Sequence, residues 1–197
     1  MRIAFLRHGP TDWNAAGRVQ GHTDIPLSET GLAKMAGLCL PFEFPRVFAS
    51  TMTRARQTAA ALRLAEPVLD ARLMEQNWGR WEGLTRDDIF ARDGDDAFVK
   101  AGSERGTDFR PPGGESTGEL HARIAAFLKD AAQGEGNAVV VAHLGVLRAA
   151  YTLATGWNMA TPMPADLNAS KILLLSLTPD GAASMEALNV AFIARTP

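Results

Sequence analysis

The stretch AVVVAHLGVLRA, from Ala138 to Ala149, contains the pattern that decides the fold. Ala138 to Ala142 is a continuous, valine-rich apolar run, which is typical of a strand buried on both faces of a sheet. Apolar residues at helical spacing follow, from Val146 to about Ala154. A buried strand that leads directly into a helix favours an α/β domain with a largely parallel sheet.

Strand and helix patterns alternate along the rest of the chain. Further strands are expected at 2–6, 46–49 and 68–69, and a terminal hairpin is expected from strands at 171–177 and 184–190. Helices are expected after Ser28, after Ser50 or Thr51, after Thr85 and after Ser116, because each of these residues can cap a helix. The first of these helices is expected to extend to Cys39. Segments 7–27 and 101–114 lack a sustained period and are expected to be loops.

Composition and charge argue against several classes of protein. The 197 residues are 46% hydrophobic, which suits one domain spanning residues 1–197. A net charge of −2 provides no basic field, so neither nucleic acid nor a membrane is expected as a partner. The chain does not open with a basic segment and a long apolar run, so a cytoplasmic protein is expected. A lone Cys39 is incompatible with an internal disulfide framework.

Imidazole and guanidinium groups follow three of the expected strands. Arg7-His8-Gly9 follows the first strand, Arg54 lies shortly after the second, and His143 directly follows the valine-rich one. Ligands bind at the carboxyl ends of parallel strands, where these side chains would meet if the strands are neighbours. Arginine matches phosphate or carboxylate bidentately, and glycines and helix N-termini add backbone N–H donors. The sequence therefore predicts a local anion site in a chain with only four histidines.

Four sequence blocks resemble one known family. They are LRHGPTDWN (6–14), ASTMTRARQTA (49–59), LMEQNWGRWEG (73–83) and VVVAHLGVLRA (139–149). In this order they are similar to the signature blocks of the histidine phosphatase superfamily, also called phosphoglycerate mutase-like. The resemblance implies a phosphoglycerate mutase-like fold, a three-layer α/β/α arrangement around a largely parallel sheet.

The resemblance also implies catalytic roles. His8 would attack phosphorus and become a phosphohistidine, a covalent intermediate that divides one displacement into two. Arg7, Arg54 and His143 would surround the phosphoryl oxygens. Glu75 would donate the proton to the leaving alcohol, and Glu82, in the same block, is the alternative donor. The family is metal-independent, so neither a metal nor a cofactor is expected.

Other positions carry weaker expectations. The resemblance assigns substrate contacts to Thr11, Asn14, Gln20 and Gly21. His121 lies in the helix after Ser116, away from the four blocks, and is expected to be exposed or half-buried. Leu144 stands where many relatives have glycine, which leaves the substrate class open.

The short chain and the block GRWEG are similar to the phosphatase branch, which favours hydrolysis of a small phosphorylated metabolite. Candidates are α-ribazole phosphate, a sugar phosphate or a broad set of esters. The alternatives are phosphoglycerate mutase-type phosphoryl transfer and a non-catalytic phospholigand-binding module. Whether the protein forms a homodimer, and whether segment 101–114 is a lid, stays open at this point.

Overall fold

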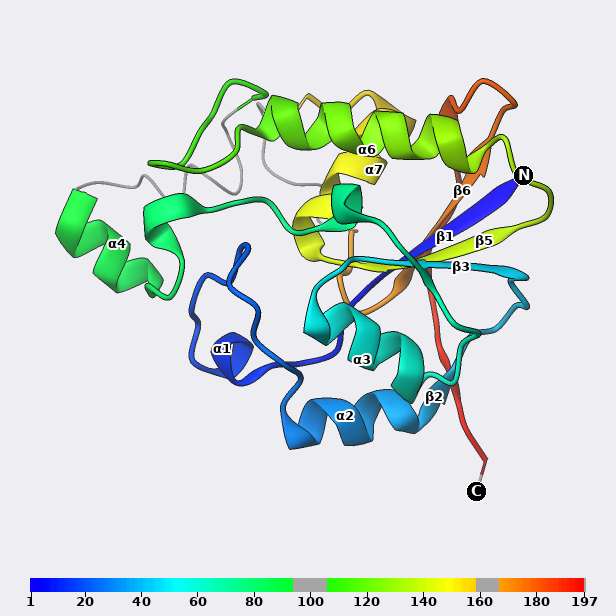
Figure 1. Cartoon of the computed structure of the whole chain (residues 1–197), viewed down its shortest axis with the longest axis horizontal. Coiled ribbons are helices and arrows are strands. Elements are labelled where there is room, and N and C mark those ends of the chain that lie inside the picture. Colours follow the sequence, from blue (N-terminus) through cyan, green and yellow to red (C-terminus); the bar gives the residue numbers. More distant parts are fainter. Residues whose placement is uncertain (94–105, 159–166, 197) are drawn as a thin grey trace.

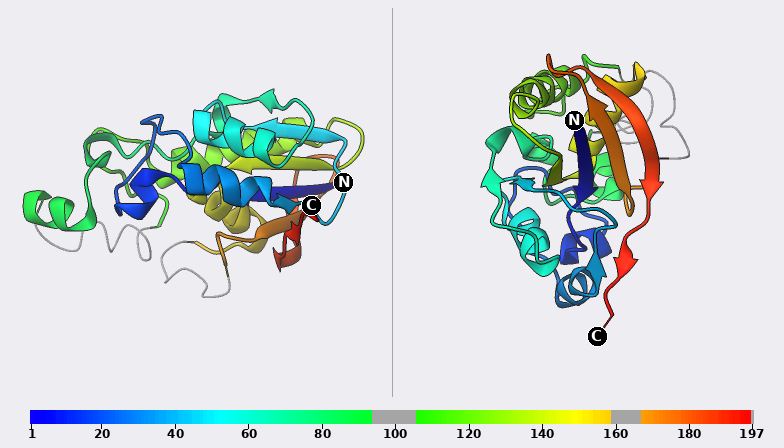
Figure 2. Two further views of the ribbon diagram at one scale, coloured as in Figure 1. Left: turned by 90° about the horizontal axis from the view of Figure 1, so that it is seen from below. Right: turned by 90° about the vertical axis from the view of Figure 1, so that its right-hand side faces the viewer.

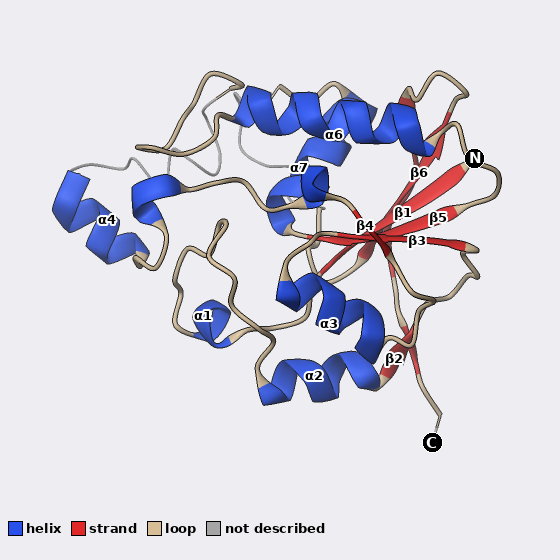
Figure 3. Cartoon of the chain, in the orientation of Figure 1, coloured by secondary structure: helices blue, strands red, loops and turns tan. Residues whose placement is uncertain are grey.

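The chain folds around a six-stranded sheet in the order β4-β3-β5-β1-β6-β7 (Figures 1 and 3). The computed structural model describes residues 1–93, 106–158 and 167–196. The strands of the sheet are β1 (Arg2–Arg7), β3 (Arg46–Ala49), β4 (Val68–Leu69), β5 (Ala138–Ala142), β6 (Ile172–Leu177) and β7 (Ala183–Val190). β1, β3, β4 and β5 are parallel, whereas β6 and β7 are antiparallel. The predicted largely parallel sheet and terminal hairpin are confirmed.

The valine-rich strand β5 lies in the interior of the sheet between β1 and β3. All of its residues are fully buried, because helices cover both faces. Val140 packs on one side, and Val139 and Val141 pack on the other. A strand covered in this way has no polar face, which explains its unbroken apolar sequence.

Helices form the two outer layers (Figures 1 and 2). On one face, α6 (Thr117–Ala131) and α7 (Leu144–Thr155) pack on the sheet, where β1 contributes Ile3 and Phe5. On the other face, α2 (Glu29–Ala36) and α3 (Thr53–Ala61) pack on Ala4 and Leu6 of the same strand. Alternation along β1 therefore supplies both cores, and the three-layer expectation is confirmed.

The helices expected after Thr85 and Ser116 both begin with a capping box. At α6, Ser116 Oγ accepts from Glu119 N at 3.1 Å, and Glu119 Oε2 accepts from Ser116 N at 2.9 Å. At α4 (Arg86–Asp93), Thr85 and Asp88 make the same reciprocal bonds, at 3.2 and 2.9 Å. Both helices therefore begin directly after Thr85 and Ser116, as the sequence predicts.

The cap predicted for α3 is wrong. The helix begins at Thr53, and its N-cap residue, Met52, offers no side-chain acceptor. Asp24 from the first loop replaces it, because its carboxylate accepts from Thr53 N at 2.8 Å and Thr53 Oγ1 at 2.7 Å. A contact between residues so distant in sequence leaves no local signal.

Other differences from the sequence expectations are local. The first loop contains a short helix, α1 (Asp12–Ala15), and α2 ends before Cys39, which lies in β2 (Leu38–Cys39) paired with β8 (Ile193–Ala194). Single turns of 3₁₀ helix occur at η1 (Ala71–Leu73) and η2 (Gly79–Trp81). Residues 101–105 of the predicted connector lie outside the described residues, and residues 106–114 form turns and irregular backbone. No helix within the described ranges is long and apolar enough to cross a bilayer.

Phe127 of α6 gives a test of the core. Its ring is 1% exposed and meets Phe48 of β3 edge to face at 5.3 Å. We expect Phe127→Ala to lower the free energy of unfolding by about 3–5 kcal/mol, since it leaves a cavity in the core. Phe90→Ala is the matched control, because Phe90 is 59% exposed and its loss should change stability by less than about 0.5 kcal/mol. Chemical denaturation measures both, and equal effects would contradict this packing.

Candidate active site

Three strand ends meet at one edge of the sheet. Two hydrogen bonds fix their alignment: His8 N donates to Ala142 O at 2.9 Å, and Ser50 N donates to Val141 O at 3.0 Å. The residues that follow β1, β3 and β5 therefore lie side by side, as the sequence predicts. A cavity of about 340 Å³ opens beside them and is lined by Arg7, His8, Arg54 and Glu75.

The two histidines contact each other. Their ring centroids are 5.2 Å apart, and His8 and His143 are 6% and 0% exposed. Burial first, and then the neighbouring cations, lower the pKa of both imidazoles well below 6.5. Both rings are therefore neutral at neutral pH.

Hydrogen bonds select the tautomer of each ring. His8 Nδ1 lies 2.7 Å from Gly9 O, and because a carbonyl only accepts, Nδ1 carries the proton and Nε2 keeps a lone pair. His143 is the opposite case, since Arg54 Nε donates to its Nδ1 at 3.2 Å. The His143 proton is therefore on Nε2, which donates to Ser50 Oγ at 2.8 Å. Ser50, expected as a helix cap, instead orients a histidine.

Arg54 is fully buried at the base of the site. Its Nη2 donates to Gly21 O at 2.8 Å and its Nη1 to Thr23 O at 3.0 Å, in addition to the bond to His143. Burial lowers the pKa of this guanidinium, and the charge of Glu75 partly offsets that effect. These three bonds use only part of the five N–H groups of an arginine, so Arg54 retains donors for an anion.

Arg7 adds a second guanidinium to the cavity. Burial lowers its pKa, and its Nε is buried with no hydrogen-bond partner among the described residues. An unpaired buried donor is costly, and a bound oxyanion would satisfy it. Within the described ranges no cluster of three His, Cys, Asp or Glu side chains is suitable to hold a metal ion.

The Glu75 carboxylate lies in the cavity against the start of α7. Its Oε1 accepts from Gly145 N at 3.0 Å and from Gln76 N at 2.9 Å. A side chain at position 145 would collide with this carboxylate, so the approach requires glycine there. The backbone N–H of Gly145, in the helix that follows His143, therefore binds Glu75. Leu144, the first residue of α7, lines the cavity.

Glu82 is the predicted alternative to Glu75, but its carboxylate is held elsewhere. Oε1 accepts from His22 N at 2.8 Å and from Trp78 N at 3.1 Å, while Oε2 accepts from Thr23 N at 2.8 Å and from Thr23 Oγ1 at 2.6 Å. It is not among the residues that line the cavity. Glu82 thus holds the loop whose carbonyls bind Arg54, and Gly21, with φ +55°, leaves room for it.

The predicted substrate contacts divide into two groups. Asn14, Gln20 and Gly21 line the cavity, and the Oε1 of Gln20 is buried without a partner among the described residues. Thr11 does not line it. Its hydroxyl accepts from Asn14 N at 3.1 Å as the cap of α1, so Thr11 orients Asn14 rather than facing the cavity.

Sequence reasoning missed the wall formed by α6 and α7. Thr117 and His121 of α6 and Arg148 of α7 line the cavity. The expectation that His121 is exposed or half-buried is wrong: it is 9% exposed, and burial lowers its pKa. The helical spacing could have indicated this wall, because residues four apart lie on the same helix face. This spacing places His121 beside Thr117, and Arg148 beside Leu144.

The neutral histidines give a test that requires no assay of activity. In a buffer without phosphate, we expect the ring resonances of His8 and His143 to show no titration between about pH 8 and about pH 6. The unfolded chain gains protons at these positions below about pH 6.5, whereas the folded chain does not, so stability falls as the pH falls. His143→Gln should make that fall shallower. NMR and denaturation at several pH values measure both, and a midpoint near 6.5 for either ring would contradict the burial argument.

The family comparison agrees with the geometry. A model of the histidine phosphatase superfamily (branch 1) matches residues 3–190. A 2,3-bisphosphoglycerate-dependent phosphoglycerate mutase from Methylobacterium radiotolerans is 36% identical over 174 residues, covering 80% of this chain and 81% of the relative. Phosphoserine phosphatase 1 from Hydrogenobacter thermophilus is 27% identical over 170 residues, covering 81% and 79%.

A solved structure supports the same assignment. Mycobacterial glucosyl-3-phosphoglycerate phosphatase in complex with VO3 superposes with a TM-score of 0.79 at 26% identity, covering 96% of this chain and 99% of that one. Relatives thus include both mutases and phosphatases of phosphate esters. With a family model matching nearly its whole length, the chain belongs to the histidine phosphatase superfamily, branch 1.

Proposed function

We propose that the chain is a metal-independent phosphomonoesterase that acts on a small phosphorylated metabolite through a phosphohistidine at His8. The observation that carries the proposal is the tautomer of His8 and its place in the cavity. Its Nδ1 proton is engaged by Gly9 O, and its lone pair is on Nε2 in a cavity that also contains Arg7 and Arg54. A neutral imidazole beside two guanidinium groups suits attack on a bound phosphate.

In the first step, Nε2 of His8 forms a bond to phosphorus while the bond from phosphorus to the ester oxygen breaks. Arg7 and Arg54 stabilise the charge on the phosphoryl oxygens, and His143 supports this pocket through its bond to Arg54. Glu75, when protonated, gives its proton to the departing alcohol oxygen. The products of this step are the free alcohol and phosphohistidine.

In the second step, the ionised Glu75 takes a proton from water, and the water oxygen attacks phosphorus. The bond from phosphorus to Nε2 breaks, which restores neutral His8 and releases inorganic phosphate. One carboxyl group thus serves as acid and then as base. The phosphatases among the relatives support hydrolysis as the net reaction.

A mutase is the second candidate, because a relative at 36% identity carries that name. A mutase would pass the phosphoryl group from His8 to a second substrate hydroxyl instead of to water. The two reactions share the first step and differ in the acceptor. A phosphoryl transfer rate between hydroxyls that exceeds the rate of phosphate release would favour the mutase.

The first prediction of this proposal concerns His8 and metals. We expect inorganic phosphate release from a panel of phosphate monoesters to persist in excess chelator and to vanish in His8→Ala, because the nucleophile is lost. When the reaction is stopped rapidly without acid, phosphohistidine should be detected on the parent protein and not on the variant. Full activity of His8→Ala would refute the mechanism. Loss of the parent protein's activity in chelator would also refute it. Binding of phosphate esters without turnover or transfer would favour a non-catalytic module.

The second prediction separates Glu75 from Glu82 by the leaving group. Glu75→Gln removes the proton donor, so kcat/KM should fall by about 10²–10⁴ for an alkyl phosphate, whose alkoxide needs a proton. It should fall much less for p-nitrophenyl phosphate, whose phenolate leaves unaided. Glu82→Ala loosens the loop that holds Arg54, so kcat/KM should fall by a similar factor for both esters, about tenfold or more. Steady-state kinetics on the two esters measure this, and the reverse pattern would assign the proton to Glu82.

A further inference from the structure

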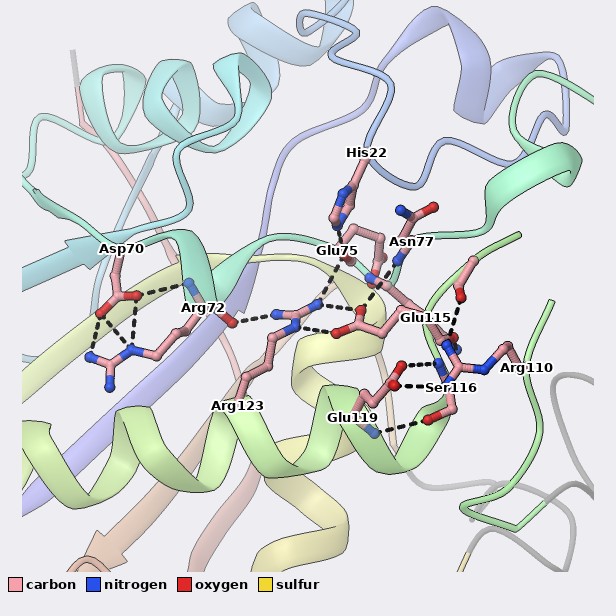
Figure 4. Close-up of polar contacts among 12 residues, drawn as sticks. His22, Asp70, Arg72, Glu75, Asn77, Arg110, Glu115, Ser116, Glu119 and Arg123 are labelled. Atoms are coloured by element: carbon pink, nitrogen blue, oxygen red, sulfur yellow. Dashed lines mark hydrogen bonds and ion pairs between the residues drawn. The ribbon is translucent and has the colours of Figure 1, made fainter. Parts of the chain in front are cut away.

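The backbone carbonyl of Glu75 is held from two sides. Arg123 Nη2, from α6, donates to Glu75 O at 3.0 Å. His22 Nε2, from the first loop, lies 2.9 Å from the same oxygen and must donate, because a carbonyl only accepts. Figure 4 shows the two side chains approaching Glu75 from opposite directions.

Arg123 makes further contacts that fix its own position (Figure 4). Its Nε and Nη2 bind the Glu115 carboxylate at 2.6 and 2.9 Å, and its Nη1 donates to Arg72 O. The side chains of Arg123 and Glu115 are only 18% and 15% exposed. A bidentate, largely buried pair of this kind is rigid, unlike an ion pair at the surface.

Glu115 also holds the chain that follows Glu75. Its N–H donates to Asn77 O at 2.8 Å, its carboxylate accepts from Asn77 N at 3.3 Å, and its carbonyl accepts from Gln76 Nε2 at 3.0 Å. Arg123 therefore fixes the chain at Arg72 and Glu75, and Glu115 fixes it at the next two residues. Residues 74–78, which include Glu75, lie between η1 and η2 and have no regular secondary structure of their own.

We propose that Arg123, locked by Glu115, is a positioning residue for the proton donor. The inference rests on the proposed function, in which Glu75 protonates the leaving alcohol. Proton transfer requires the carboxyl group within hydrogen-bond reach of the ester oxygen, and small displacements are costly. Because the Glu75 segment has no regular secondary structure, the Arg123–Glu115 pair fixes the backbone from which the carboxyl group reaches Gly145 N. Neither Arg123 nor Glu115 lines the cavity.

A second ion pair near the start of the same helix gives a matched control. Arg110 Nη2 binds Glu119 Oε1 at 2.6 Å, and both side chains are about half exposed, at 49% and 52%. Arg110 also donates to Gly114 O, and among the described residues it makes no hydrogen bond to Glu75. Arg110→Gln therefore removes the same charge from another ion pair involving α6 without releasing the proton donor.

The experiment compares kcat/KM for an alkyl phosphate and p-nitrophenyl phosphate in the parent, Arg123→Gln, Arg123→Lys and Arg110→Gln. The ratio kcat/KM covers only the steps up to departure of the alcohol, so hydrolysis of the phosphohistidine does not enter. We expect Arg123→Gln to lower the alkyl value by about tenfold or more and the p-nitrophenyl value by less than about threefold. Arg123→Lys should restore part of the alkyl activity, and Arg110→Gln should match the parent.

Equal losses on both esters in Arg123→Gln, or no loss on either, would overturn the proposal. Where Arg123→Gln does not fold, as judged by circular dichroism, Glu115→Gln replaces it, because it loosens the pair while leaving the guanidinium. Glu75→Gln separates this failure from failure of the proposed function. If that variant shows no dependence on the leaving group, the donor role of Glu75 is wrong; if it does and Arg123→Gln does not, only the positioning role is wrong.

Discussion

The buried guanidinium of Arg54 is the constraint on which the rest of the site depends. Burial of a charge costs free energy of hydration, which hydrogen bonds to the charged group must offset. The hydrogen-bond partners of Arg54 come from separate parts of the chain. Gly21 O and Thr23 O belong to the first loop, and His143 follows the central strand β5. Removing any partner would leave a buried donor unsatisfied. The loop, the helix α3 and the end of β5 are therefore tied together by one side chain.

The loop that binds Arg54 needs its own support, because it has no regular secondary structure over these residues. Glu82 provides that support through its bonds to His22 and Thr23, and the glycine at position 21 permits the close approach. Asp24, next in the chain, binds the start of α3. The Glu82 and Asp24 carboxylates thus hold residues 22–24 in place, next to Gln20 and Gly21, which line the cavity.

Sequence reasoning reached the groups that follow strands and missed those that act through tertiary contacts. His8, Arg54 and His143 were found because parallel strands bring their carboxyl ends together, a rule that works from pattern alone. The roles of Glu82 and Asp24 depend on backbone donors far away in sequence, and no local pattern encodes them. His121 was missed for a different reason: its helix face could be read from the spacing, but the residue lies away from the four blocks and was therefore expected to be exposed or half-buried.

Separate contacts hold the two halves of the proposed active site. The proposed phosphate pocket is held by the first loop and Glu82, whereas the segment that carries Glu75 is held by Arg123 of α6 and by Glu115, which precedes that helix. They meet at the carbonyl of Glu75, which accepts from both His22 and Arg123.

Between these supports, the part of the cavity wall formed by Thr117 and His121 makes none of the hydrogen bonds that hold His8, Arg54 or Glu75 among the described residues. Side chains on that wall can therefore change without moving the reacting groups. A fold built in this way can keep one phosphoryl chemistry while the alcohol that it accepts varies, which agrees with relatives named for different phosphate esters.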